Sequence, residues 1–290
     1  MNYRHVYHAG NFADVLKHLI LTLVITYLKR KLTPFRVIDT HAGAGVYHLG
    51  STEAQKTGEW RNGIGRLLSA ELPENAAEVL SPYLDLIVGI DEDMRGAGTG
   101  EERRGELLHY PGSPLIAARL LRAQDFLIAN ELHPEDCRTL QRVLGRFENA
   151  KVMGVDGYIA LKAVLPPKER RGVVLIDPPF EEPGELDRLL AGLRQGVKRF
   201  ETGTFLMWFP IKDPRTISRF KRELGGLGLG KLMAVEFYVR APDDVERLNG
   251  HGLVILNPPF TLSDDLERVL PALVGVLREG AGAGFEITAL

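Results

Sequence analysis

Two hydrophobic patterns alternate along this chain. Stretches with apolar residues every three or four positions predict helices, and the short continuous apolar runs between them predict buried strands. The first helical stretch covers residues 12–30, and Asn11 is placed to cap its first turn. Pro34 ends this stretch, and residues 35–39 form the first apolar run.

The same alternation continues to the end of the chain. Further strands are predicted at residues 126–129, 151–153, 172–176, 203–209, 231–239, 253–256 and 285–290. Further helices are predicted at residues 113–121, 134–146, from 156 onward, and at 184–196, 214–224 and 262–277. This order predicts an α/β protein with a Rossmann-like, doubly wound and mostly parallel sheet. Ligands of such sheets bind at the carboxyl ends of the strands.

Residues 50–110 differ in character from the rest of the chain. They are acidic and rich in turn-forming residues. We therefore predict one main domain formed by residues 1–49 and 111–290. Residues 50–110 are predicted to form an inserted, mostly helical subdomain.

Composition limits the class of protein further. The chain has 290 residues, an apolar fraction of 44% and a net charge of −2, so it can bury a large core and is not a general polyanion binder. The N-terminus lacks a signal-peptide hydrophobic region, and the longest apolar stretch, residues 19–28, is too short to span a bilayer. The single cysteine, Cys137, excludes an internal disulfide. We therefore expect a cytoplasmic protein.

Positive charge is concentrated in two stretches. Residues 1–36 carry six lysines and arginines against one acid, and residues 194–222 carry eight against two. Most such runs are solvated faces. Two of them beside one site could instead form a rim that binds phosphate groups.

Asp177-Pro178-Pro179-Phe180, directly after the apolar run 172–176, suggests a specific chemistry. The lone pair of an exocyclic amine such as adenine N6 is delocalised into its ring. If the Asp177 carboxylate and the Pro178 carbonyl each accept one N–H hydrogen, that lone pair is directed at a methyl donor. The prolines hold the backbone rigidly, and Phe180 offers a face on which a flipped base can stack. Taken alone, the tetrapeptide is equally consistent with a strand stopped by two prolines.

Other strand ends supply residues for a donor site. Gly43 and Gly45 follow the first strand and allow the backbone to approach a ligand closely. Glu131 follows the next strand, where a carboxylate can accept hydrogen bonds from two ribose hydroxyls. Asp156 follows the third and can accept from the amine of an adenine. This series predicts a site for an adenosine-containing methyl donor, whereas an NAD site would require a further glycine where His48 stands.

A second tetrapeptide, Asn257-Pro258-Pro259-Phe260, also fits the amine-methylating pattern. We assign the chemistry to Asp177, because its strand is fourth after the glycine loop and is expected beside the first strand. The second copy follows two later strands, in a region expected to reverse direction.

Four histidines raise the question of a metal site. His5, His8, His18 and His41 lack both the helical pairing of a zinc site and accompanying cysteines. We expect them to form hydrogen bonds around the carboxylate of the donor, and we predict no metal.

Six segments are specific enough to be compared with a known family: residues 3–5, 8–18, 39–45, 110–117, 131–134 and 170–180. Together they resemble RlmJ-type enzymes, which are bacterial adenine-N6 methyltransferases of large-subunit ribosomal RNA. The last position of the catalytic motif is often tyrosine in that family and is Phe180 here. The ring is kept, and the phenol hydroxyl is lost.

The resemblance implies a class I methyltransferase fold, S-adenosylmethionine as the methyl donor, no metal, and a monomer that methylates N6 of a specific adenine in 23S ribosomal RNA. It implies that Asp177 faces the target amine and that Tyr3 contacts RNA. We place Pro178 and Phe180 with Asp177 at the catalytic site, and Arg4 with Tyr3 at the RNA. The resemblance implies a donor pocket lined by Lys17, His18, His41, Ser113, Glu131, Asp156 and Gly157, to which the glycine loop adds Gly43. Methylation of DNA adenine or of a protein glutamine amide, and RNA binding without catalysis, are the alternatives.

Overall fold

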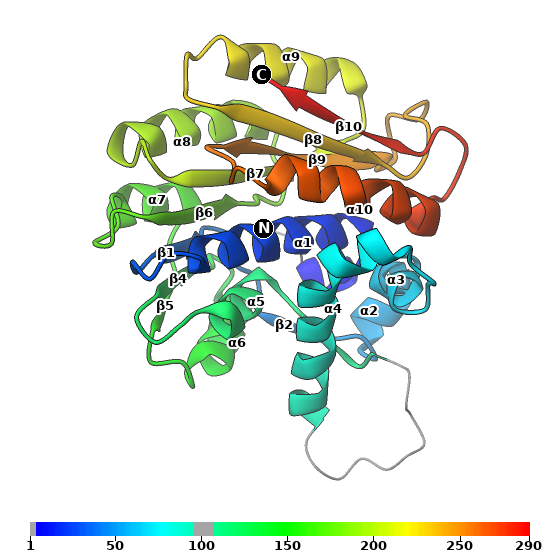
Figure 1. The fold of residues 1–290 in the computed structure, drawn as a ribbon. Coiled ribbons are helices and arrows are strands. Elements are labelled where there is room, and N and C mark those ends of the chain that lie inside the picture. The colour runs from blue at the N-terminus through cyan, green and yellow to red at the C-terminus, as the bar shows by residue number, and fades with distance from the viewer. Residues whose placement is uncertain (1–3, 96–106) are drawn as a thin grey trace.

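The computed structural model describes residues 4–95 and 107–290. Its centre is a sheet of eight strands with helices on both faces (Figure 1). The strands are β1 (Arg36–Asp39), β4 (Phe126–Asn130), β5 (Ala150–Met153), β6 (Gly172–Ile176), β7 (Thr204–Ile211), β8 (Leu232–Tyr238), β9 (Gly250–Leu256) and β10 (Gly284–Ala289). Their order across the sheet is β10-β8-β9-β7-β6-β1-β4-β5. The predicted doubly wound α/β fold is confirmed.

Strand direction determines where a site can form. β5, β4, β1, β6 and β7 are parallel neighbours, so their carboxyl ends lie at one edge of the sheet. β9 is antiparallel to β7 and β8, and it therefore ends at the opposite edge. The reversal of direction that was expected in the region of the second tetrapeptide occurs at β9. The chain crosses from β5 back to β6 on the other side of β1, which makes the β1–β6 boundary the topological switch point where ligands of such folds bind.

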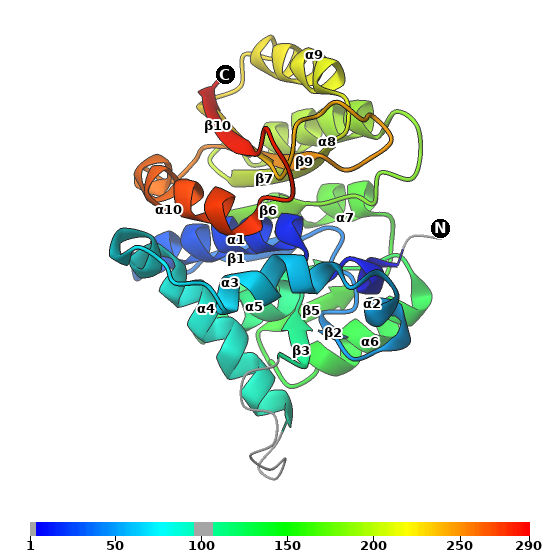
Figure 2. The same cartoon turned by 90° about the vertical axis from the view of Figure 1, so that its right-hand side faces the viewer.

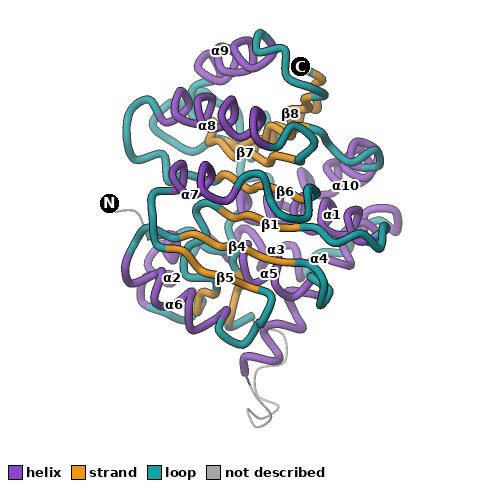
Figure 3. Tube along the Cα trace, turned by 90° about the vertical axis from the view of Figure 1, so that its left-hand side faces the viewer, coloured by secondary structure: helices purple, strands orange, loops and turns teal. Residues whose placement is uncertain are grey.

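Helices cover the two faces with separate hydrophobic clusters. α7 (Gly157–Val164), α8 (Glu185–Arg199) and α9 (Pro214–Gly225) pack on one face. The other face carries α1 (Phe12–Lys29), α5 (Ser113–Leu120), α6 (Pro134–Leu144) and α10 (Leu262–Leu277). Figure 3 shows α7 and α8 on one side of the strands and α1 and α10 on the other. No helix in residues 4–95 or 107–290 has both the length and the apolarity needed to cross a membrane.

The first turn of α1 is capped as predicted. The Asn11 side-chain oxygen accepts hydrogen bonds from the backbone N–H groups of Ala13 and Asp14, at 2.9 and 3.0 Å. This cap fixes the start of the helix. It thereby also sets the positions of Asp14, in the first turn of α1, and of Lys17, in the second.

Residues 50–110 contribute α2 (Thr52–Thr57), the helical turn η2 (Arg61–Gly65), α3 (Arg66–Leu68) and α4 (Glu74–Arg95). α4 packs against α1 and α10 (Figure 2). Leu80 and Tyr83 of α4 belong to the same hydrophobic cluster as α1. A two-stranded antiparallel sheet of β2 (Val46–His48) and β3 (His109–Pro111) joins the ends of the segment. The division into a main domain and a subdomain stays a prediction.

Candidate functional site

A cavity of about 730 Å³ opens at the carboxyl edge of the parallel strands. Its volume lies in the range of small-molecule and cofactor sites. It is lined by all the residues predicted for donor binding and catalysis: Lys17, His18, His41, Gly43, Ser113, Glu131, Asp156, Gly157, Asp177, Pro178 and Phe180. Of the two residues predicted to contact RNA, Tyr3 lies outside the described residues and Arg4 lies beside the cavity without lining it.

The glycine loop after β1 is held by Glu131. One carboxylate oxygen of Glu131 accepts a hydrogen bond from the Gly43 N–H at 2.8 Å, and the other accepts from the His133 N–H at 2.7 Å. Gly43 has a φ of +62°, and a Cβ there would lie 2.1 Å from the Tyr47 hydroxyl oxygen. Each carboxylate oxygen has a further lone pair, so Glu131 can also accept from ligand hydroxyls. Burial raises the pKa of Glu131.

Asp156 has a double role at the start of α7. One oxygen of its carboxylate accepts from the N–H groups of Tyr158 and Ile159, both at 3.0 Å, and so caps the helix. The other oxygen lies 3.4 Å from Arg188. The backbone of α7 approaches His41 closely, because a Cβ on Gly157 would lie 2.4 Å from the His41 Nε2 atom. Glycine at this position therefore allows the start of α7 to pack directly against His41.

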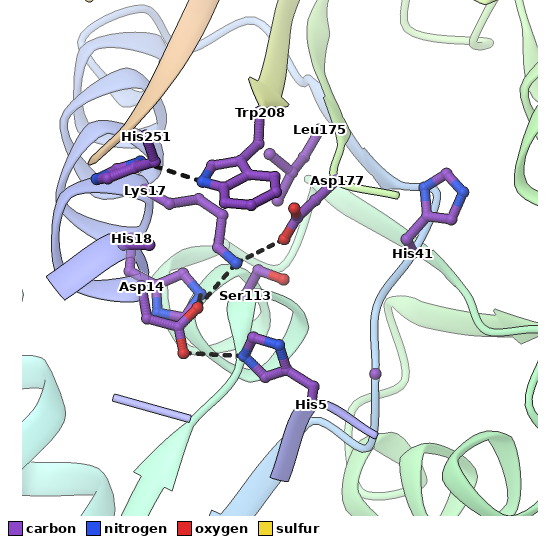
Figure 4. Close-up of polar contacts among 12 residues, drawn as sticks. His5, Asp14, Lys17, His18, His41, Ser113, Leu175, Asp177, Trp208 and His251 are labelled. Atoms are coloured by element: carbon purple, nitrogen blue, oxygen red, sulfur yellow. Dashed lines mark hydrogen bonds and ion pairs between the residues drawn. The ribbon is translucent and has the colours of Figure 1, made fainter. Parts of the chain in front are cut away.

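Asp177 forms a buried ionic network with α1 (Figure 4). The Lys17 Nζ atom lies 2.5 Å from Asp177 Oδ2 and 2.8 Å from Asp14 Oδ1. The other oxygen of Asp14 contacts His5 Nε2 at 2.9 Å and accepts from the Gly10 N–H at 2.9 Å. Lys17 is only 4% exposed, so its charge depends on these carboxylates.

The pKa values in this network follow from burial and charge together. Burial acts to raise the pKa of Asp14, but His5 and Lys17 hold it well below its ordinary value. Burial acts to lower the pKa of Lys17, but Asp14 and Asp177 raise it above its ordinary value. Asp14 and Lys17 are therefore both charged at neutral pH. The sequence indicated Lys17 only as a pocket residue and gave no signal for the roles of Asp14 and His5.

Two further groups near the glycine loop have shifted pKa values. Burial raises the pKa of Asp39 to about 7, although Ser113, whose hydroxyl donates to the carboxylate at 2.6 Å, opposes the shift. Burial lowers the pKa of His41 to about 4. The imidazole of His41 is therefore neutral at pH 7 and lies 2.9 Å from the Thr40 hydroxyl.

Phe180 meets a second aromatic residue that the sequence did not indicate. Its ring is nearly perpendicular to that of Trp208, at 70° and 5.6 Å between centroids. Ile176 pairs with Met207, so Asp177 and Trp208 are the next residues on neighbouring strands. Trp208 had no sequence signal, because it lies within a strand instead of at its end.

The second Pro-Pro motif lies at the opposite edge of the sheet. Asn257 follows β9, and its side-chain amide donates to the backbone carbonyls of Glu201 and Gly203 at 2.8 and 2.9 Å. These carbonyls precede β7, whereas Asp177 follows β6. Asn257 therefore fastens the start of β7 and does not line the pocket.

The basic residues are arranged differently from the expected rim. Lys198 and Arg199 lie in the last turn of α8, whose first turn borders the cavity. A helix of 15 residues is roughly 20 Å long, so this part of the expected rim is wrong. Arg4 forms ion pairs with Glu135 and Asp136 at 2.9 and 3.3 Å.

α9 presents positive charge closer to the cavity. Lys212, directly before this helix, lines the cavity. Ile217, Phe220 and Leu224 form the buried side of α9, and its exposed arginines are Arg215, Arg219 and Arg222. On this exposed side Arg215 forms an ion pair with Asp213, and Arg219 forms one with Glu223.

Within the described parts of the chain, no group of three or more histidine, cysteine, aspartate and glutamate side chains has the arrangement of a metal site. His5 Nε2 lies 2.9 Å from Asp14, and His18 Nδ1 lies 2.8 Å from the Tyr110 hydroxyl. Hydrogen bonding of the histidines to the carboxylate of the donor stays a prediction.

The chain is similar to known proteins in both sequence and fold. The family model described as "RsmJ: Ribosomal RNA large subunit methyltransferase D, RlmJ" matches residues 32–286. Ribosomal RNA large subunit methyltransferase J of Haemophilus influenzae is 41% identical, over 98% of this chain and 96% of its own length. The protein of the same name from Escherichia coli is 40% identical, over 94% of this chain and 92% of its own. The crystal structure of protein LPL1258 from Legionella pneumophila is 31% identical with a TM-score of 0.83, covering 97% of this chain and 98% of that one.

Proposed function

The chain belongs to the RlmJ family of ribosomal RNA large-subunit methyltransferases, and from this membership we propose that it methylates N6 of an adenine in 23S ribosomal RNA. The observation that carries the adenine-N6 assignment is the position of Asp177. It follows β6 beside β1, lines the cavity, and is succeeded by two prolines and an aromatic ring.

The residues of the cavity fit an adenosine-containing donor. Gly43 and Gly157 line the cavity at the carboxyl ends of β1 and β5, and glycine is required at both positions because a Cβ would clash with Tyr47 or His41. Glu131 and Asp156 each have carboxylate lone pairs beyond those used by backbone N–H groups, and these can accept from ribose hydroxyls and an amine. Bound S-adenosylmethionine would supply an electrophilic methyl group.

Asp177 and Pro178 would hold the target amine. In the proposed arrangement, the Asp177 carboxylate accepts one N6–H hydrogen and the Pro178 carbonyl accepts the other, so the lone pair is no longer conjugated with the ring. Lys17 binds Asp177 Oδ2 and fixes the direction of the carboxylate. The preorganised charge costs no reorganisation when the methyl group arrives. Phe180 provides the surface on which the flipped base stacks.

The alternative substrates have less support. The curated relatives are named as ribosomal RNA methyltransferases, which favours RNA over DNA or a protein amide. The intact glycine loop, Glu131 and Asp177 disfavour RNA binding without catalysis. We further propose that the protein is a monomer.

The proposal is tested by methyl transfer in vitro. Purified protein is incubated with labelled S-adenosylmethionine and unmodified large-subunit RNA, and the product is digested to nucleosides. The label is expected in N6-methyladenosine, at one position of the RNA. Label in another nucleoside, or transfer to DNA in preference to RNA, would show that the assignment is wrong.

A further inference from the structure

Trp208 and His251 form a hydrogen-bonded pair next to the catalytic motif (Figure 4). The indole Nε1–H of Trp208 on β7 donates to Nδ1 of His251 on β9 at 3.1 Å. Trp208 pairs directly with Leu253, so His251 is its diagonal neighbour on the same face of the sheet. The two rings are nearly parallel, at 24° and 6.2 Å between centroids. The orientation of the indole is thus set by both a hydrogen bond and ring packing.

His251 is an unusual residue for its surroundings. It is 0% exposed and lies against the rings of Phe12 and Phe237, at 5.6 and 6.2 Å. Burial lowers its pKa to about 3, and the positive charge of Lys17 adds to this shift. The ring is therefore neutral, and since Nδ1 accepts from Trp208, Nε2 carries the hydrogen.

The Nε2–H group of His251 is buried and makes no hydrogen bond to any described residue. An unpaired buried N–H group destabilises a protein, so an apolar side chain would fill this position with less cost. The imidazole offers one thing that an apolar residue does not, namely an acceptor for the Trp208 N–H.

Trp208 in turn faces the space next to the catalytic carboxylate. It lines the cavity, is level with Asp177 on the adjacent strand, and meets the Phe180 ring at 70°. A base stacked on Phe180 would be parallel to that ring. Because both rings line the cavity with their centroids 5.6 Å apart, such a base would lie against the indole, and the indole would limit how far the base can slide.

We propose that Trp208 forms the end wall of the pocket for the flipped target base and that His251 is a positioning residue that fixes this wall. The inference rests on the proposed function, because it assumes a planar base with an exocyclic amine at Asp177. Misplacement of a reacting group by about 1 Å can lower a rate by about 100-fold. The pair would thus act on turnover more than on donor binding.

Matched substitutions of His251 test the proposal. His251→Leu removes the acceptor, whereas His251→Asn keeps an oxygen at the place of Nδ1. We expect His251→Leu and Trp208→Ala to lower kcat at saturating RNA by at least about tenfold, and His251→Asn to recover most of the loss. Donor affinity, measured by calorimetry, should change by less than about twofold. Equal turnover in the Leu and Asn variants, or a loss of donor affinity as large as the loss in kcat, would overturn it.

Fluorescence gives a readout that does not depend on turnover. The chain has two tryptophans, so Trp60→Phe leaves Trp208 as the sole indole. An adenine-containing RNA oligonucleotide should quench this emission in the Trp60→Phe protein, and less so after His251→Leu is added. Thermal melting identifies any variant that fails to fold. In that case the test rests on the Trp60→Phe protein, and an absence of quenching in this protein would overturn the proposal.

The two proposals fail in different ways. Quenching of Trp208 by RNA without any methyl transfer would refute the proposed function and leave the base-binding role of Trp208 supported. Normal methyl transfer by both Trp208→Ala and His251→Leu would refute the inference and leave the proposed function intact.

Discussion

Replacing the first residue of each Pro-Pro motif by alanine should have different effects on methyl transfer and on the free energy of unfolding. Asp177→Ala removes the carboxylate that would hold the target amine, an interaction that strengthens in the transition state. Loss of one such preorganised group lowers turnover by roughly 100- to 1,000-fold. Lys17 loses its contact at 2.5 Å but keeps Asp14 at 2.8 Å, so the buried charge stays paired. The free energy of unfolding should therefore fall by only about 1.5–3 kcal/mol.

Asn257→Ala is the matched control. It removes two hydrogen bonds to backbone carbonyls, of 2.8 and 2.9 Å, at a residue whose φ of +51° disfavours alanine. The free energy of unfolding should fall by roughly 2–4 kcal/mol, while turnover of the folded protein stays near normal. Methyl transfer to unmodified RNA and denaturant titration measure the two effects. An active Asp177→Ala protein, or an inactive but folded Asn257→Ala protein, would refute the assignment of the catalytic edge.

Three other predictions follow from the site and its charges. Glu131→Ala should weaken donor binding by roughly 1–3 kcal/mol in calorimetry, and unchanged affinity would remove Glu131 from the donor site. Replacing Lys212, Arg219 and Arg222 on and beside α9 by glutamine should flatten the salt dependence of RNA affinity by about 0.7 per lost phosphate contact, whereas the same change at residues 198–199 should leave the slope unaltered. Burial raises the pKa of Asp39 from 3.8 to about 7, so its contribution to stability is complete at low pH and is lost as pH rises through this range. Asp39→Asn should therefore reduce the decline in unfolding free energy between about pH 4 and 7 in denaturant titrations, and an identical decline would contradict the shift.

The sequence predicted most elements because their patterns are local. The parallel strands are continuous apolar runs between turn-forming residues, and α1 begins at the predicted cap, Asn11. β9 was predicted as residues 253–256 but begins at Gly250, since a strand start of glycine and histidine lacks an apolar pattern. Gly252 is required there, because a Cβ would lie 2.3 Å from the Phe209 ring. β2 and β3 were missed because each has three residues and they pair across a long segment.

The residues of the site likewise fall into those that can be recognised from local sequence and those that depend on the topology. Glycines and acids at strand ends can be recognised from sequence, because the fold class places all these ends at one edge. The Lys17–Asp177 contact joins residues 160 positions apart, and it depends on how α1 lies across the sheet. The Trp208–His251 contact likewise depends on β9 being inserted antiparallel between β7 and β8. No local pattern carries such information.

The two tetrapeptides show why a motif needs its topology. Both follow a buried strand, and amide and carboxylate oxygens can both accept a hydrogen bond from an amine. β6 is parallel to β1, so Asp177 is placed where the glycine loop and Glu131 gather. β9 is antiparallel, so Asn257 faces the other edge, where its amide is used by backbone carbonyls and Phe260 is 86% exposed. The direction of one strand thus decides which copy can meet a donor bound at the β1 loop, and reversing residue identity at either position would not exchange the two roles.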